Sequence, residues 1–414
     1  MSKKKVCIFS LGCKTNQYEA SCLATSFYEK GFDVSFNLDK SDIYIINTCA
    51  VTNEAERKSR QAIQRAKSLN DKAKIIVIGC ASQANKNNFI NKKVDLIKGS
   101  YGKSNLIKQF SENGTFIEDE PIIYEKFPKP YVLDKTRALL KIQDGCNNYC
   151  SYCIIPYVRG RSRSRKIEDI IEEAKYIESF SSEIVVTGIN IASFGKDTNE
   201  SINDLIKELS RIKSRFRFGS LYVEMINEEL LSTLKSCNNF CPHFHLSLQS
   251  GSDAVLKDMN RKYTTSDYKN AVALIRKYFP TASITTDIIV GYPSETENNF
   301  NETINFIKDI KFSNIHIFKF SPKKGTKASM LKTLPTSILN YRMQVMKNLK
   351  KELIENYLNL NIGSTQEVIF EKNEDELKVG HSRNYLKVYA KSNKDIANVF
   401  CHKIYKDGLL GEEI

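Results

Sequence analysis

The chain has 414 residues and a mass of 47.3 kDa, too long for one typical domain and long enough for two or three. With 41% hydrophobic and 27% charged residues, it has the composition of an ordinary globular protein. Lysine and arginine (62) outnumber aspartate and glutamate (48), giving a formal charge of +14, which favours a polyanionic partner such as RNA. Excess lysine is also typical of a solvated surface, so charge alone does not decide the partner.

The N-terminal sequence, MSKKKVCIFSLGC, places lysines before an apolar run that is far too short for a signal-peptide core. No later stretch approaches the length of a membrane span. We therefore expect a cytoplasmic protein with no membrane partner. Its eleven cysteines would then lie in a reducing compartment, which favours metal binding or catalysis over disulfides.

Three short apolar runs at residues 5–13, 41–49 and 73–80 are typical of buried parallel strands, and residues 53–69 have helical periodicity. This alternation predicts an open α/β domain. The runs end at Cys13, Cys49 and Cys80. Because parallel strands end at one edge of a sheet, these cysteines should converge there as ligands. The alternative is that each is a small buried hydrophobic residue.

Residues 111–130 are acidic, irregular and contain proline, which indicates a linker. A second α/β series follows, in which helical stretches separate six strand-like segments. The six repeats predict a complete or partial parallel barrel, with its chemistry at the C-terminal ends of the strands. The segments are 138–145, 182–190, 217–225, 242–251, 282–293 and 313–322.

A long helix is predicted over residues 336–359, and short alternating strands follow it. These strands indicate a small antiparallel β-barrel of the size that binds nucleic acid. The predicted domains are therefore residues 1–125, 126–354 and 355–414. The last carries eight basic and ten acidic residues, so it would contact RNA only through a local face that includes Arg383.

The stretch DGCNNYCSYC places Cys146, Cys150 and Cys153 in a C-x3-C-x2-C pattern after the first strand of the second domain. Three soft thiolates suit a four-iron cluster and leave one iron without a protein ligand, so that iron can take a substrate. A structural zinc site would need a fourth ligand, and none of the five histidines is close in sequence. A haem attachment motif, C-x-x-C-H, is absent.

CNNYCSYC matches the cluster loop of radical S-adenosylmethionine (SAM) enzymes. With LGCKTNQYE, NTCAVTNEAERKSR and VIGCASQ before it, the chain resembles a methylthiotransferase over essentially its whole length, and its last barrel resembles a TRAM domain. Among the groups of that family, VTGINIASFG and HLSLQSGSDAVLKDMNRKYT resemble MtaB, which acts on N6-threonylcarbamoyladenosine beside the anticodon of tRNA. Ile189 and Asn190 favour this group over those acting on isopentenyladenosine or a ribosomal protein.

The resemblance implies two [4Fe-4S] clusters and two SAM molecules per turnover. The Cys146, Cys150 and Cys153 cluster would bind SAM and yield a 5'-deoxyadenosyl radical, which the substrate requires because its C2 carbon has no acidic proton. The Cys13, Cys49 and Cys80 cluster would carry the sulfur, so both must face one cavity. The implied partners are the tRNA anticodon stem-loop and a flavodoxin or ferredoxin; no DNA partner is expected.

Within this fold we expect eight residues to bind SAM, with Tyr152 beside the adenine and Arg261 toward the carboxylate, for which its guanidinium fork is suited. The others are Thr187, Gly188, Ser247, Gln249, Asp287 and Gly291. A run of arginines after the cluster loop, with two later lysines, is expected to contact RNA phosphates. These residues are Arg159, Arg161, Arg163, Arg165, Lys323 and Lys324.

Two rival interpretations remain. One is the same reaction on isopentenyladenosine in tRNA or on a ribosomal protein; the other is a non-catalytic, metal-stabilised RNA-binding protein. Iron and sulfide analysis under anaerobic conditions separates the enzyme from the binding protein, because the latter would hold one structural zinc. A zinc site at Cys237, Cys241, His243 and His245 is the weaker interpretation of that segment, because His245 belongs to a strand.

Overall fold

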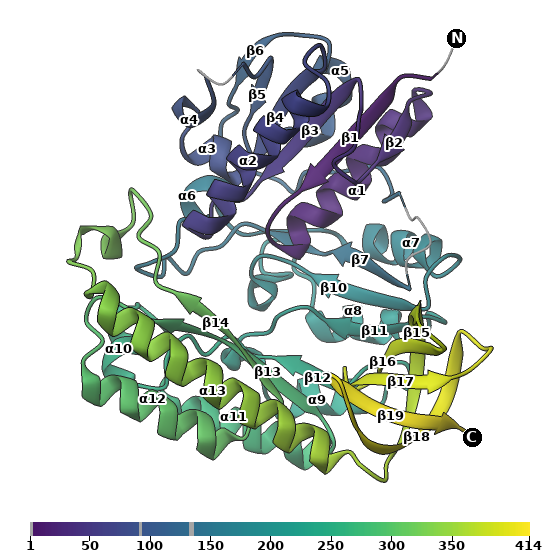
Figure 1. The fold of residues 1–414 in the computed structure, drawn as a ribbon, viewed down its shortest axis with the longest axis vertical. Helices are drawn as coiled ribbons and strands as arrows, with labels where there is room; N and C mark the ends of the chain where they lie inside the picture. Colours follow the sequence, from purple (N-terminus) through teal and green to yellow (C-terminus); the bar gives the residue numbers. More distant parts are fainter. Residues whose placement is uncertain (1–2, 91–92, 132–135) are drawn as a thin grey trace.

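The computed structural model describes residues 3–90, 93–131 and 136–414. Figure 1 shows an N-terminal sheet stacked on a central set of strands and helices, with a small barrel at the C-terminal end. Within the described residues, no helix is both long and apolar enough to cross a membrane.

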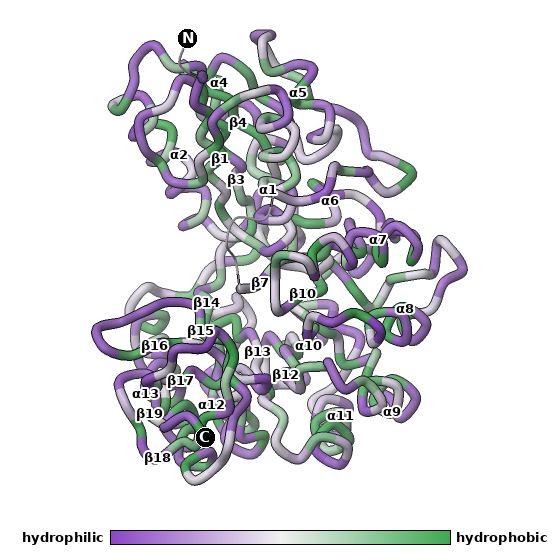
Figure 2. The backbone as a smooth tube through the Cα atoms, turned by 90° about the vertical axis from the view of Figure 1, so that its right-hand side faces the viewer, coloured by the Kyte–Doolittle hydropathy of each residue, from purple (hydrophilic) through white to green (hydrophobic). Residues whose placement is uncertain are grey.

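The N-terminal sheet is wholly parallel and has the order β2-β1-β3-β4-β5-β6. All six residues of β3 and five of six in β4 are buried, because helices cover both faces of the sheet. Figure 2 shows hydrophobic residues along these strands. The elements are β1 (Lys5–Ser10), α1 (Lys14–Glu29), β2 (Asp33–Ser35), β3 (Ile43–Thr48), α2 (Asn53–Leu69), β4 (Lys74–Gly79), α3 (Cys80–Ala84), α4 (Asn87–Ile90), β5 (Leu96–Lys98), α5 (Leu106–Gln109) and β6 (Gly114–Phe116).

Strand β6 lies inside the segment predicted to be an irregular linker, so that prediction is wrong at Gly114–Phe116. Its three residues are too few, and too exposed, to show a strand period. The rest of the segment, residues 117–130, contains no helix or strand. Its carboxylates are nevertheless used: Glu118 pairs with the buried Lys98, and Glu120 accepts from the backbone of Arg161.

The central strands form two parallel three-stranded sheets, β7-β10-β11 and β12-β13-β14. Isolated bridges at Phe216–Phe240 and Leu221–Leu246 connect the sheets, so six parallel strands form the predicted partial barrel. The elements are β7 (Arg137–Lys141), β8 (Gln143–Asp144), α6 (Ile155–Arg159), β9 (Arg163–Ser164), α7 (Ile167–Ile177), β10 (Glu183–Thr187), α8 (Ile202–Leu209), β11 (Arg215–Phe218), α9 (Glu228–Lys235), β12 (His243–His245), α10 (Asp253–Asp258), α11 (Thr265–Tyr278), β13 (Ser283–Val290), α12 (Glu297–Ile310), β14 (Asn314–Lys319) and α13 (Thr336–Leu360).

The C-terminal strands close a barrel in the order β15-β16-β17-β19-β18. The predicted small β-barrel is confirmed, and its strand pairs are antiparallel except β17 and β19, which are parallel. A closed ring of five strands cannot alternate direction throughout. Residues 381–391 do not form one continuous strand, because a turn in which Tyr385 has φ of +63° separates β16 from β17. The strands are β15 (Thr365–Glu374), β16 (Leu377–Ser382), β17 (Lys387–Lys391), β18 (Ile396–Tyr405) and β19 (Gly408–Glu413).

Candidate functional site

A cavity of about 890 Å³ runs along the inner face of the central strands. Alternate residues of β10, β12, β13 and β14 line it, as the two-residue period of a strand requires; on β12 and β13 these are His243, His245, Thr285 and Asp287. All three parts of the chain contribute to the wall. Cys13 and Lys14 come from the N-terminal sheet region, and Tyr385 comes from the β16–β17 turn.

Cys146, Cys150 and Cys153 lie on the loop between β8 and α6, and all three line this cavity. The backbone N–H of Asn148 donates to Cys146 Sγ at 3.5 Å, and Arg261 Nη1 donates to Cys150 Sγ at 3.4 Å. Burial raises the pKa of the Cys153 thiol to about 12, with the nearby Cys150 adding to the effect. Coordination to a metal deprotonates such thiols. Three thiolates with N–H donors at their sulfurs fit the iron–sulfur cluster that the sequence predicts.

Cys49 and Cys80 directly follow β3 and β4, and Cys13 follows β1 after Leu11 and Gly12; the three strands are neighbours in the N-terminal sheet. Burial, together with Cys80 and Cys13 nearby, raises the pKa of the Cys49 thiol to about 12. Cys13 lines the cavity, whereas Cys49 and Cys80 are buried at 3% exposure each. The sheet edge therefore presents one cysteine of this triad to the cavity and holds the other two behind it.

Gly12 allows the close approach of these cysteines. Its φ is +93°, and a Cβ at this position would lie 2.6 Å from Cys49 Sγ. A side chain here would displace Cys49 as well as strain the backbone. The backbone N–H of Val51 donates to Cys49 Sγ at 3.4 Å, and Arg159 Nε donates to Cys80 Sγ at 3.3 Å. Two sulfurs of this triad therefore also accept hydrogen bonds from N–H donors, as sulfurs that ligate a metal can.

Seven of the eight residues predicted to bind SAM line the cavity: Tyr152, Thr187, Gly188, Ser247, Gln249, Arg261 and Asp287. Gly291 does not. A Cβ on Gly291 would lie 2.4 Å from Leu339 Cδ2, and its N–H donates to Glu295 Oε2 at 2.9 Å. We therefore correct its role: this glycine is required where α13 packs on the end of β13.

The cavity wall also contains residues that the sequence prediction missed. His245 Nε2 lies 3.3 Å from Asp287 Oδ2, and the ring centroids of His245 and His316 are 5.5 Å apart. Of the described residues, only these three bring ligand atoms of a potential metal group within 4.8 Å of one another, so the weaker zinc interpretation at Cys237 and Cys241 finds no such group. The sequence did contain a signal for His245 and His316, because each lies two residues after another cavity-lining residue of its strand, β12 or β14.

The predicted arginine surface is wrong for Arg159 and Arg163, which are 1% and 3% exposed and cannot contact RNA phosphates in this structure. Arg159 Nη1 pairs with Glu19 at 2.8 Å and with Asp144 at 2.9 Å. Arg163 donates to the carbonyl oxygens of Arg161 and Arg159 at 2.6 and 2.9 Å. Arg159 turns inward because Glu19 of α1 and Asp144 of β8 supply buried acceptors, whereas carbonyl oxygens of its own segment hold Arg163.

Lys323 is also buried, and its ammonium donates to Glu56 Oε1 at 2.7 Å and Asn53 Oδ1 at 3.0 Å. Its predicted contact with RNA is therefore wrong as well. Arg165 is 11% exposed and pairs with Glu173 at 2.9 Å. Arg161 and Lys324 are exposed, and their contact with RNA stays a prediction. Half-buried Arg383 donates to the carbonyl oxygen of Phe240 at 3.0 Å, which fixes the C-terminal barrel to the central one.

Tyr385 lines one end of the cavity. Its ring stacks on His243 at a centroid distance of 4.9 Å, and the guanidinium of Arg217 lies 4.7 Å from its centroid. Behind it, buried Glu183 accepts from Arg217 Nε at 2.7 Å and from Arg215 Nε at 2.7 Å. Burial alone would raise the pKa of Glu183, but Arg217 and its neighbouring arginines lower it to about 2. The positive charges of Arg215 and Arg217 at this end of the cavity are therefore balanced in part by the Glu183 carboxylate.

Two sequence families match the chain. The family described as "Radical SAM superfamily" matches residues 140–307, and the family described as "Uncharacterized protein family UPF0004" matches residues 5–99. The first range contains the Cys146–Cys153 loop and most of the cavity. The second contains Cys13, Cys49 and Cys80.

Full-length relatives are also similar to this chain. "Threonylcarbamoyladenosine tRNA methylthiotransferase MtaB" of Aquifex aeolicus is 38% identical over 87% of this chain and 91% of its own. "tRNA-2-methylthio-N(6)-dimethylallyladenosine synthase" of Thermodesulfovibrio yellowstonii is 34% identical over the whole of both chains. The solved radical SAM methyltransferase TsrM of Kitasatospora setae is 13% identical, with a TM-score of 0.58 over 79% of this chain and 77% of its own, and is similar in fold alone.

Proposed function

This chain belongs to the radical SAM tRNA methylthiotransferase family, and from that premise we propose that it inserts a methylthio group at C2 of N6-threonylcarbamoyladenosine beside the anticodon. Four relatives named for this nucleoside are 35–38% identical to the chain. Four named for dimethylallyladenosine are 33–34% identical. The difference is small but consistent, and it agrees with the residues that favoured this group in the sequence.

The observation that carries the proposal is the shared cavity. Cys13 of one triad and all of Cys146, Cys150 and Cys153 line it. A reaction that makes a radical at one site and delivers sulfur from another requires both to face one space closed to water. At about 890 Å³, the cavity has the volume of a site for a bound cofactor together with a substrate nucleoside.

A [4Fe-4S] cluster and SAM, when bound, supply a 5'-deoxyadenosyl radical by reductive cleavage of SAM. The protein's own residues orient the reactants. Cys146, Cys150 and Cys153 would hold the cluster, and Arg261, beside Cys150 Sγ, is placed to donate to the SAM carboxylate. Tyr152 lines the same wall and offers an apolar ring to the adenine. Ser247 and Asp287 present polar atoms for the ribose.

Cys13, Cys49 and Cys80 would hold a second [4Fe-4S] cluster that carries the sulfur. The proposal assigns this role to the N-terminal sheet because its cysteines fit such a cluster: three thiols, two of them buried, with N–H donors at two sulfurs. Cys13 lies at the cavity wall, so the sulfur would be delivered from its side. The site would use a second SAM molecule to methylate that sulfur.

The proposed partners are the anticodon stem-loop and a flavodoxin or ferredoxin that supplies electrons. The substrate base must leave its stack to reach the cavity, as it does in enzymes that modify bases. Exposed Arg161 and Lys324 are the charged residues still available at the surface from the predicted RNA-binding set, with half-buried Arg383 in the C-terminal barrel. These would contact phosphates without reading the sequence.

Anaerobic assays on the reconstituted protein test the proposal. We expect about eight iron atoms per chain, and the 2-methylthio derivative of N6-threonylcarbamoyladenosine should be detected by nucleoside mass spectrometry. Replacing Cys146, Cys150 and Cys153 by alanine should abolish SAM cleavage, whereas replacing Cys13, Cys49 and Cys80 should leave cleavage but abolish sulfur insertion. If the protein modified only isopentenyladenosine or only a ribosomal protein, the proposed substrate would be refuted. One zinc without SAM cleavage would refute the enzyme.

A further inference from the structure

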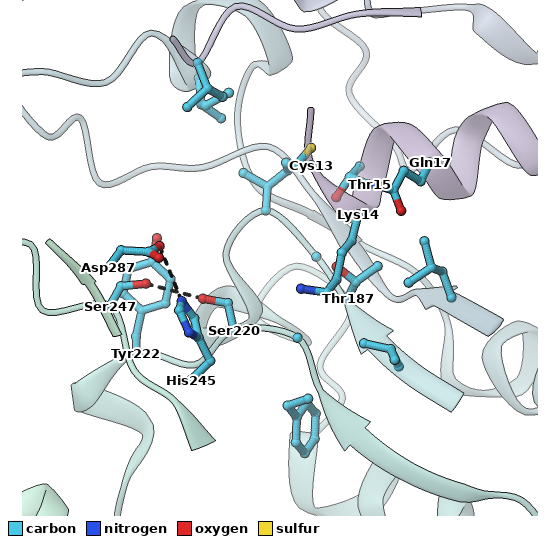
Figure 3. Close-up of a pocket in the computed structure, with 18 of the residues that line it drawn as sticks. Cys13, Lys14, Thr15, Gln17, Thr187, Ser220, Tyr222, His245, Ser247 and Asp287 are labelled. Atoms are coloured by element: carbon cyan, nitrogen blue, oxygen red, sulfur yellow. Dashed lines mark hydrogen bonds and ion pairs between the residues drawn. The ribbon is translucent and has the colours of Figure 1, made fainter. Parts of the chain in front are cut away.

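Lys14 lies beside the proposed sulfur-carrying triad and faces the reaction cavity. It follows Cys13 and is the first residue of α1. Figure 3 shows its side chain pointing away from α1 into the cavity, toward Thr187 and the loop that carries Ser220. A Cβ on Gly219 would be 3.4 Å from Lys14 Cδ, so the methylenes lie against the end of β11. The ammonium is therefore held at the cavity wall near Thr187 and the end of β11.

The other strong cations of the wall already have partners. Arg137 Nε and Arg217 Nη2 pair with Glu183 at 2.5 and 2.7 Å. Arg261 donates to Cys150 Sγ and to the carbonyl oxygen of Ser247. Within residues 3–90, 93–131 and 136–414, Lys14 has no ion pair and its ammonium donates no hydrogen bond. Its charge is therefore available to an anion that enters the cavity.

Asp287 on β13 is the carboxylate that lines the same cavity. Figure 3 shows it across the open space from Lys14, and its Oδ2 lies 3.3 Å from His245 Nε2. Asp287 and Lys14 form no ion pair in the structure. The lysine therefore faces the open cavity without a direct ion-pair partner, while the carboxylate across from it pairs with His245, an arrangement that suits recognition of a negatively charged ligand.

The chemistry of the proposed substrate supplies that anion. N6-threonylcarbamoyladenosine has a carboxylate and a hydroxyl on its N6 substituent. In the adenine ring, C2 and C6 flank the same nitrogen, N1, so the substituent extends from the ring edge that receives the sulfur. Lys14 and Cys13 line the same cavity, so the ammonium is on the wall that the substituent faces when C2 is near the sulfur donor. An isopentenyl group would offer the ammonium no partner in a partly desolvated site.

We propose that Lys14 is a specificity-determining residue whose ammonium binds the threonine carboxylate of the modified adenosine. This inference rests on the proposed function and deepens it, because it assigns the preference for the threonylcarbamoyl group to one side chain. A charge-assisted hydrogen bond of this kind is worth about 10- to 100-fold in affinity.

The test compares three anticodon stem-loops of one sequence, which carry N6-threonylcarbamoyladenosine, its threonine carboxamide analogue or N6-isopentenyladenosine. Lys14→Met removes the charge at similar length, and Lys14→Arg keeps it. Lys30→Met is the matched control, because Lys30 is exposed at the other end of the same helix. Binding is measured by fluorescence anisotropy on cluster-loaded and unloaded protein, and KM and kcat are measured on loaded protein.

The wild-type protein and Lys30→Met should bind the acid about 10- to 100-fold more tightly than the carboxamide. Lys14→Met should bind both at the carboxamide level, and Lys14→Arg should retain a preference for the acid. The effect should be in KM more than in kcat. If Lys14→Met takes up less iron than wild type, the affinities for the acid and the carboxamide are compared on unloaded protein of both.

Persistent preference for the acid in Lys14→Met would overturn the inference, as would an equal loss of affinity for all three RNAs, which would indicate a phosphate contact. Failure of the proposed function is a separate result. Wild-type protein that modified the isopentenyladenosine RNA alone would refute the substrate itself. Modification of the threonylcarbamoyl RNA with unchanged discrimination in Lys14→Met would remove only the role of Lys14.

Discussion

Replacing Arg159 by methionine should destabilise the contact between the N-terminal sheet and the central barrel. Its guanidinium is 1% exposed and reaches Glu19 and Asp144 at 2.8 and 2.9 Å. It also donates to Asn16 Oδ1 at 2.6 Å and to Cys80 Sγ at 3.3 Å. Glu19 belongs to the N-terminal region and Asp144 to the central one, so this one side chain connects both.

The charges that remain around Glu19 and Asp144 determine how much stability Arg159→Met loses. Lys103 and Lys141 remain beside Glu19, and Lys141 remains beside Asp144, when Arg159 is removed. The two carboxylates then still face two ammonium groups. Breaking a buried pair by removing one partner costs about 3–5 kcal/mol, and the remaining lysines place this case at the lower end, about 3 kcal/mol. With the Cys80 thiolate formed, a third negative charge would lose its cation. The loss should therefore be larger in cluster-loaded protein.

Urea unfolding followed by far-ultraviolet circular dichroism is the appropriate assay, since the chain has no tryptophan. With a slope of about 3 kcal/mol per molar urea, the Arg159→Met midpoint should fall by about 1 M. Arg161→Met is the matched control, because Arg161 is exposed on the same segment and should change stability by less than about 0.5 kcal/mol. Equal midpoints for the two variants would refute the reasoning, as would slower iron loss to a chelator from Arg159→Met than from wild type.

Three further predictions concern other parts of the molecule. Gly12→Ala should displace Cys49 and reduce iron toward about four atoms per chain while 5'-deoxyadenosine is still formed; unchanged iron would contradict the steric argument. Glu183 should stabilise the fold above pH 4.5 and lose that contribution as pH falls toward 2, because its pKa is lowered to about 2. This lowering of the Glu183 pKa corresponds to about 3 kcal/mol of stability. The difference between the urea midpoints of wild type and Glu183→Gln should therefore narrow as the pH falls from 4.5 to 3, and a constant difference would contradict this prediction. Tyr385→Ala should cost about 1–2 kcal/mol through its lost stacking and cation–π contacts, measured as the same midpoint with exposed Tyr341→Ala as the control.

The alternation of apolar runs and helical segments was sufficient to predict the order of the α/β units. Residues 53–69 form a helix over the predicted range, and six parallel strands follow one another as predicted. These features depend on local periodicity and burial, which the sequence records directly. Short elements were predicted less well. β6 has three residues, and the break at Tyr385 depends on a left-handed turn that carries no periodic signal.

The sequence by itself determined the two cysteine triads and the family resemblance, because the ligand types and their positions after strands are local features. Only the tertiary structure decided what the neighbouring charges do. Arg159 and Arg163 resemble a solvated basic loop in sequence but are buried. Glu19, 140 residues away in sequence, pairs with Arg159 on folding, and Arg163 donates to backbone carbonyl oxygens of the same segment. Lys14 is an ordinary helix-start lysine in sequence and faces a cavity in the structure. Pairing between distant charges separates the cations that hold the fold together from those left without an ion-pair partner, such as Lys14 in the cavity.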